Sequence, residues 1–112
     1  MSNFDPMDTH RQEQERESRE LDARLKRETE EADIRWLMSC KQGRRIVWRL
    51  LESAGVYRLS YVQSDALTTA FNEGKRNGGL KLMAQVHALC PELYPVMVKE
   101  AHDADDRPGS DR

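Results

Sequence analysis

The stretch FNEGKRNGG, residues 71–79, decides the fold, because its three glycines and two adjacent basic residues allow three interpretations. It could be a phosphate-binding loop, a turn, or part of a helix with a bare face. At about 100° per residue, two of the glycines fall in one stripe with the apolar residues on either side: Leu67, Phe71, Gly74, Gly78, Leu82, Val86 and Leu89. A phosphate loop would not be expected to keep that phase. We therefore predict a helix in which Phe71 is buried and Gly74 and Gly78 let a second helix pack closely.

The ends of this helix carry recognisable signals. Ser64 or Asp65 can cap its first turn, and Pro91 ends it and suits the start of the next helix. The adjacent pair Gly78-Gly79 is a strong local breaker, so a helix split in two is the open alternative.

Two shorter helices are predicted on either side. Residues 43–55, GRRIVWRLLESAG, are amphipathic, with Gly43 breaking the preceding helix, Gly55 as the terminating glycine, and a buried face made of Ile46, Val47, Leu50, Leu51 and Ala54. Residues 56–62 are expected to form an ordered connector, although a strand is possible. Residues 91–102 form the last helix, kinked or delayed by Pro95, with Leu93, Val96, Met97 and Ala101 buried.

The N-terminal third differs in composition from the rest. Residues 1–9 lack an apolar pattern and are predicted to be disordered, whereas the Glu- and Arg-rich residues that follow favour a helix. Because its apolar residues are so few, with Leu21 and Leu25 the largest, we favour a solvated helical arm over a strand of a weak coiled coil. The predicted organisation is a charged arm over residues 1–32, a helical domain over 33–101 and a disordered acidic tail over 102–112. The fold class is all-α, a small bundle of three to four helices.

Charge is segregated along the 112 residues, although the formal net charge is only −2. Residues 1–33 hold 6 basic and 11 acidic side chains, and residues 34–100 hold 10 basic and 5 acidic ones. A basic centre can indicate an acidic partner such as nucleic acid, or the acidic ends can simply neutralise it. The chain has no apolar run long enough for a membrane span and no signal peptide, so we expect a cytoplasmic protein whose two cysteines, Cys40 and Cys90, are free thiols.

Candidate chemistry is sparse, and we predict that the chain is not an enzyme and needs no cofactor. His87 and Cys90 have the spacing of two metal ligands, but a structural zinc site needs four, so Cys90 is interpreted as a small buried hydrophobe. The basic residues are the stronger candidates. Their proximity to Trp48, Tyr57 and Tyr61 suits phosphate contact and base stacking, and the candidate nucleic-acid contacts are Arg44, Arg45, Arg49, Lys75, Arg76 and Lys81. The alternative is that their stems cover apolar edges and their heads pair with acids.

Four segments together resemble a family of small tailed-bacteriophage and prophage proteins whose namesake comes from a short-tailed Bordetella phage. They are DIRWLMS, GRRIVWRLLESAGVYR, FNEGKRNGGLKLMAQV and CPELYPVMVKEA, and the likeness covers roughly residues 33–101. Its most specific block is matched by Phe71, Glu73, Gly74, Lys75, Arg76, Asn77, Gly79 and Leu80. The sequence departs from the family at Gly78 and Pro95, where aliphatic residues are usual.

The resemblance implies a phage origin and supplies no catalytic residues. Genes of such proteins tend to lie among those for heads, portals and tails, which implies a virion component or assembly factor whose partners are phage structural proteins. The expected location is the virion or the host cytoplasm. The matched residues are the candidate interaction motif. A nucleic-acid-binding accessory protein is the alternative function.

Overall fold

The computed structural model describes residues 5–58 and 65–106, and its regular elements are helices. They are α1 (Pro6–Met38), α2 (Lys41–Ala54), α3 (Ala66–Leu89), a 3₁₀ turn η1 (Pro91–Leu93) and α4 (Tyr94–Asp105). The predicted all-α class is thus confirmed. The chain divides into two units, Met1–Ala32 and Asp33–Arg112.

In the first unit the helix begins at Pro6, inside the segment predicted to be disordered. Asp5 explains the early start: its side chain accepts a hydrogen bond from the Met7 amide at 2.9 Å, and Pro6 suits the first helical position. The described residues of this unit are exposed apart from Glu31, which is half-buried. Exposed ion pairs such as Arg11–Asp8, with Nη2 and Oδ1 2.8 Å apart, contribute only a few tenths of a kcal/mol each.

In the second unit, the end of α1 is followed by a break at Ser39 and Cys40, not at Gly43 as predicted. Cys40 caps α2 by accepting a hydrogen bond from the Gly43 amide on its sulfur at 3.4 Å. Gly43 is buried inside α2, and a Cβ there would lie 1.7 Å from the carbonyl oxygen of Leu37. Gly43 is therefore needed for the close approach of α1 to α2.

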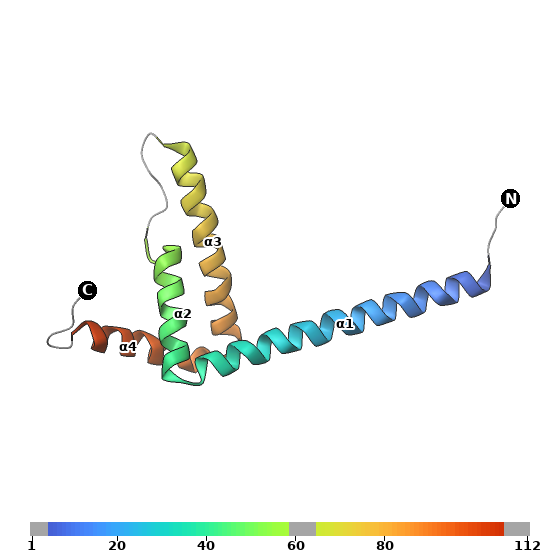
Figure 1. The fold of residues 1–112 in the computed structure, drawn as a ribbon, viewed down its shortest axis with the longest axis horizontal. Helices are drawn as coiled ribbons and strands as arrows, with labels where there is room; N and C mark the ends of the chain where they lie inside the picture. The colour runs from blue at the N-terminus through green and yellow to red at the C-terminus, as the bar shows by residue number, and fades with distance from the viewer. Residues whose placement is uncertain (1–4, 59–64, 107–112) are drawn as a thin grey trace. The chain divides into compact units, whose positions relative to one another are not determined.

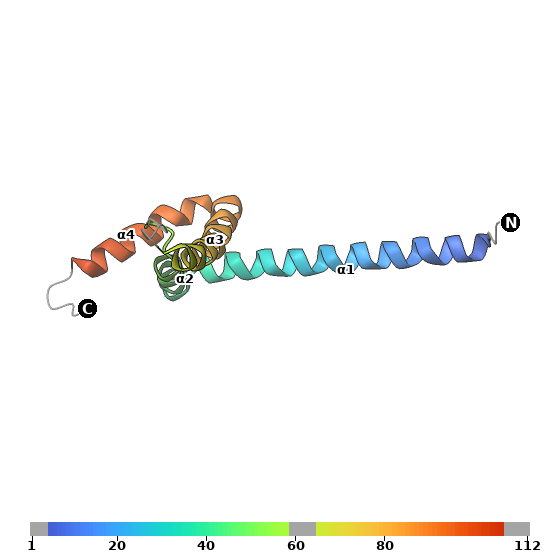
Figure 2. The ribbon, with the colours of Figure 1, turned by 90° about the horizontal axis from the view of Figure 1, so that it is seen from above.

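Helices α2 and α3 run side by side, and α4 crosses near the start of α2 (Figure 1). The view down α2 and α3 shows α4 along one side of this pair (Figure 2). Gly55, with φ of 76°, ends α2 as predicted, and Asp65 caps α3 by accepting a hydrogen bond from the Thr68 amide. α3 continues without a break through both Gly78 and Gly79. Tyr61 and most of the predicted connector lie outside the described residues.

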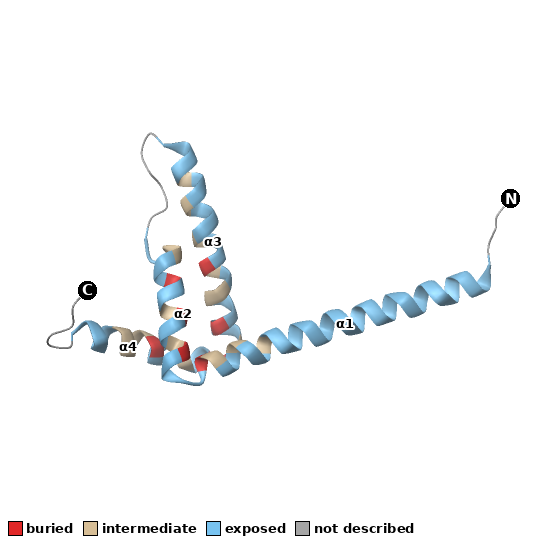
Figure 3. Ribbon diagram, viewed as in Figure 1, coloured by how far each residue is buried: buried red, intermediate tan, exposed pale blue. Residues whose placement is uncertain are grey.

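The core is small and lies where α2, α3 and α4 meet the end of α1 (Figure 3). Its buried side chains are Met38, Val47, Leu51, Val56, Val86, Cys90 and Met97. Cys90 is thus a buried hydrophobe, as predicted. The predicted burial of Ile46, Leu50 and Val96 is wrong, because these side chains are exposed.

The last α-helix starts late, as predicted, and runs further than predicted. η1 takes up the residues before Tyr94, so Pro95 falls in the first turn of α4, where its missing N–H costs no helical bond. Helix α4 then continues through His102 to Asp105, so the predicted tail from residue 102 begins too early.

Candidate interaction surfaces

The interaction motif lies on the half of α3 that extends past α2. Gly79, in the middle of α3, is the contact point: a Cβ there would lie 2.5 Å from Val56 Cγ2 and 2.6 Å from the Cβ of Ala54, at the end of α2. Since α3 has 24 residues and α2 has 14, residues 66–78 continue beyond that contact (Figure 1). The glycine that admits a neighbouring element is therefore Gly79, and the prediction for Gly74 and Gly78 is wrong, because nothing lies within 4 Å of a Cβ at either.

The apolar residues of this extension face outward. Phe71 is 66% exposed and Leu67 is 86% exposed, so the predicted burial of Phe71 is wrong. Lys75 lies over the Phe71 ring, with its ammonium nitrogen 5.5 Å from the ring centroid. Glu73, Gly74 and Asn77 are exposed, while Arg76 is half-buried, and its Nε is buried without a hydrogen-bond partner. The motif thus presents an aromatic ring and bare backbone at the surface.

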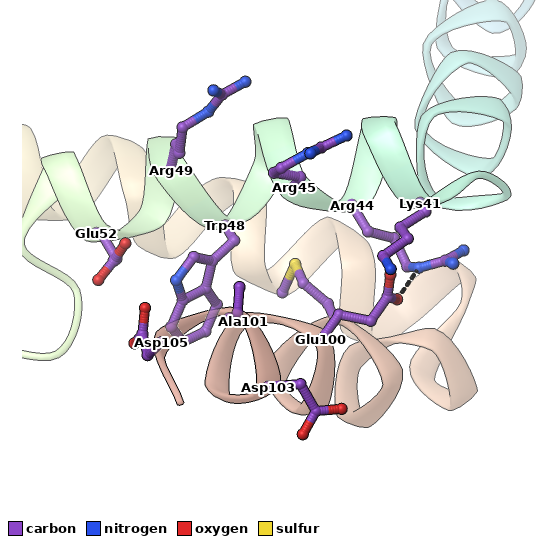
Figure 4. A pocket seen from close by; sticks show the side chains of 12 residues that line it. Lys41, Arg44, Arg45, Trp48, Arg49, Glu52, Glu100, Ala101, Asp103 and Asp105 are labelled. Carbon is purple, nitrogen blue, oxygen red and sulfur yellow. Dashed lines mark hydrogen bonds and ion pairs between the residues drawn. The ribbon is translucent and has the colours of Figure 1, made fainter. Parts of the chain in front are cut away.

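A second surface is the groove between α2 and α4, with a volume of about 300 Å³ (Figure 4). Lys41, Arg45 and Arg49 follow each other at intervals of four residues along α2, and all three are exposed at its edge. Glu100, Asp103 and Asp105 of α4 line the same groove. The α2 wall of the groove is therefore mainly basic, with Glu52 as its one acidic residue, and the α4 wall is acidic.

Arg44 connects the α2 and α4 walls of the groove. Its Nε donates to Glu100 Oε1 at 2.5 Å, and its Nη1 donates to the carbonyl oxygen of Met38 at 2.9 Å. Only 14% of the Arg44 side chain and 21% of the Glu100 side chain are exposed. Arg44 is thus a structural cation that connects α1, α2 and α4, and it is not available to a phosphate.

An aromatic chain continues from the groove along the α4 side of the molecule. The Trp48 ring lies 5.3 Å from that of Tyr57, whose hydroxyl is 2.6 Å from the Tyr94 hydroxyl. Tyr94 in turn lies 4.5 Å from the His87 ring, between centroids. Burial, with the hydrogen bond to Tyr94 adding to it, raises the pKa of the Tyr57 phenol well above its usual range. These residues hold α2, α3 and α4 together, a role that the sequence pattern did not reveal.

The six predicted nucleic-acid contacts do not form one surface. Arg45 and Arg49 line the groove with Arg44, whereas Lys75, Arg76 and Lys81 are on α3 and do not line it. Within residues 5–58 and 65–106, no three His, Cys, Asp or Glu side chains are grouped to hold a metal ion. In the same ranges, no helix has the length and hydropathy that a membrane span requires.

Comparison with known proteins identifies a family. The model of the Bbp19-like phage protein family matches residues 34–99, which include α2, α3, η1 and the first half of α4. No curated protein and no solved structure is similar enough to match. The matched residues include the motif on α3 but exclude residues 1–33.

Proposed function

The chain belongs to the Bbp19-like phage protein family, and on that basis we propose that it is a non-enzymatic interaction protein that contributes to virion assembly. One observation carries the proposal: Leu67 and Phe71 project from the part of α3 that extends past α2. Large apolar side chains exposed together are typical of protein–protein contact sites. The partners proposed for the chain as a whole are phage structural proteins of the head, portal or tail.

The geometry of the motif supports contact better than catalysis. Gly74 and Gly78 leave the α3 backbone open beside Phe71, so that a partner's side chains can reach the helix itself. Lys75 at the edge of the ring adds a rim charge to an apolar centre, the usual arrangement at interfaces.

Purified phage particles provide the test. Mass spectrometry should detect the wild-type chain in them, and Phe71→Asp should lower its amount per particle at least several-fold. Ala84→Asp is the matched control, because Ala84 is exposed on the same helix but outside the motif. Far-UV circular dichroism of both variants shows whether each is folded. Consistent absence of the wild-type chain from particles would contradict a role as a virion component.

The exposed row Lys41, Arg45 and Arg49 supports nucleic-acid binding as the second candidate. Removing two of these cations with Arg45→Gln and Arg49→Gln should weaken binding to a DNA duplex and reduce its dependence on salt. The control is Lys81→Gln, on α3. A wild-type chain that binds neither DNA nor RNA at low salt would rule this candidate out.

A further inference from the structure

The side of the α2–α3 pair that faces away from α4 carries no charged residue along its centre, although 34% of the chain is charged. On α2, Trp48 points to the groove with α4, and Ile46 and Leu50 lie two residues before and after it, about 200° around the axis. On α3, His87 stacks on Tyr94 at the start of α4, and Gln85 and Leu89 are likewise two residues away. Both pairs therefore lie opposite α4.

Each pair extends into a row at intervals of three and four residues. We name these rows together the neutral face: Gln42, Ile46, Leu50 and Ser53 on α2, with Leu67, Phe71, Gly74, Gly78, Leu82, Gln85 and Leu89 on α3. Four of its large apolar side chains are 41–86% exposed: Ile46, Leu50, Phe71 and Leu67. Depletion of charge together with exposed aromatic and aliphatic side chains is the composition of an interface centre.

We propose that the neutral face binds a second copy of this chain in a two-fold dimer. In such a dimer each surface meets its own copy, so a charged surface would oppose itself. The groove side of α2, with Lys41, Arg45 and Arg49, would suffer that repulsion along its whole length. The rows of the neutral face hold no charged residue, and Lys75 lies beside them, over the Phe71 ring. This inference names a partner for the surface on which the proposed function depends.

Shape supports the same occupant. The motif half of α3 combines bulky residues, Leu67 and Phe71, with the bare positions Gly74 and Gly78. If two α3 helices cross antiparallel near residues 74 and 75, Phe71 of each lies opposite Gly78 of the other. The ring then packs onto open backbone, which admits it without displacing any residue of its own chain.

The exposed area agrees with a weak dimer. At about 150–200 Å² per large side chain, the four exposed residues offer roughly 400 Å² of apolar surface per copy. Two copies with their glycine backbone and flanking residues reach roughly 1,000 Å², the lower end for specific interfaces. We therefore expect a reversible monomer–dimer equilibrium in roughly the micromolar range.

Sedimentation equilibrium of the full-length chain from about 1 to 300 µM tests the proposal across that range. The wild type should shift from monomer to dimer, and Phe71→Asp and Gly78→Leu should each weaken the dimer at least ten-fold. Gly78→Leu keeps the test informative because the space around Gly78 is open, so the monomer should still fold. Ala84→Asp, outside the neutral face, should dimerise like the wild type.

A wild-type chain that stays monomeric at every concentration would overturn the proposal, and so would a dimer that neither variant weakens. The proposed function fails separately, through absence from particles. A monomer that is incorporated into particles through Phe71 would therefore refute the dimer while leaving the virion role supported.

Discussion

Gly78 and Gly79 are adjacent in the chain, yet their surroundings are opposite. A side chain at Gly79 would overlap Val56 and Ala54, whereas one at Gly78 would meet open space. Both sit inside α3, where glycine costs about 1 kcal/mol relative to alanine. The same substitution therefore changes stability in opposite directions at the two sites.

The first prediction compares Gly79→Ala with Gly78→Ala in urea unfolding. The first should lower the free energy of unfolding by about 1–3 kcal/mol, because the added methyl group has to displace α2 or the residues after it. The second should raise it by up to about 1 kcal/mol through helix propensity. Measurements are made below the dimerisation range. Equal effects at the two sites would show that Gly79 is not the contact.

Arg44 connects three helices through two hydrogen bonds, so its loss should be costly. Arg44→Met keeps most of the apolar stem but leaves the Glu100 carboxylate largely buried without its partner. Breaking a buried pair from one side costs about 3–5 kcal/mol, and partial exposure here reduces that to about 2–3 kcal/mol. Unfolding of Arg44→Met, Glu100→Gln and the double variant measures the coupling. If the double variant loses the sum of the two single losses, the ion pair contributes nothing.

At the scale of elements, α3 shows how far sequence reasoning reached. Its extent, a cap at Ser64 or Asp65 and its continuity across the glycines were predicted, because each depends on local chemistry that the residues carry, and Asp65 is the cap. Which side of α3 is buried was not predicted correctly. The buried and half-buried side of α3 includes Asn72, Arg76, Gly79, Met83 and Val86, and of these only Val86 belongs to the predicted apolar stripe.

The reason is that Leu67 and Phe71, at the start of the apolar stripe of α3, remain largely exposed. Periodicity identifies an apolar side of a helix, but it does not tell whether that side meets the same chain or another molecule. The α2 prediction failed in the same way at Ile46 and Leu50, which also belong to the neutral face, whereas Val47 and Leu51 are buried as predicted. The residues predicted as core and found exposed are largely the candidate interface.

Asp65 supplies a prediction at the scale of one helix. Hydrogen bonds from the Thr68 hydroxyl and amide lower the pKa of its carboxyl group. Because the pKa of Asp65 is lower in the folded state than in the unfolded state, its ionised carboxylate stabilises the fold at pH values above the unfolded-state pKa. That stabilisation is lost as the pH falls through the folded-state pKa. Asp65→Asn keeps a capping side chain but removes the titration. The urea midpoint should therefore fall less for Asp65→Asn than for the wild type when the pH is lowered from about 6 to about 3, a range that spans the usual carboxyl pKa.

At the scale of the whole molecule, the two units differ in how many buried residues they supply to the core. In the part of the chain that the structure describes, the seven buried hydrophobic residues lie between Met38 and Met97, and the first unit contributes none of them. Its described residues form a charged helix with exposed ion pairs such as Arg11–Asp8. A helix of that kind is marginal in water, because most helical stability comes from packing.

Removing residues 1–32 should therefore leave the second unit folded. We expect the truncated chain to unfold cooperatively in urea at the midpoint of the full-length chain, since no core contact is lost. The far-UV signal at 222 nm should lose the contribution of the arm, and in the full-length chain that contribution should melt gradually and before the main transition. The control is a truncation after residue 93, which removes Met97 and should abolish cooperative unfolding. A midpoint that drops when only the arm is removed would show that the two units stabilise each other.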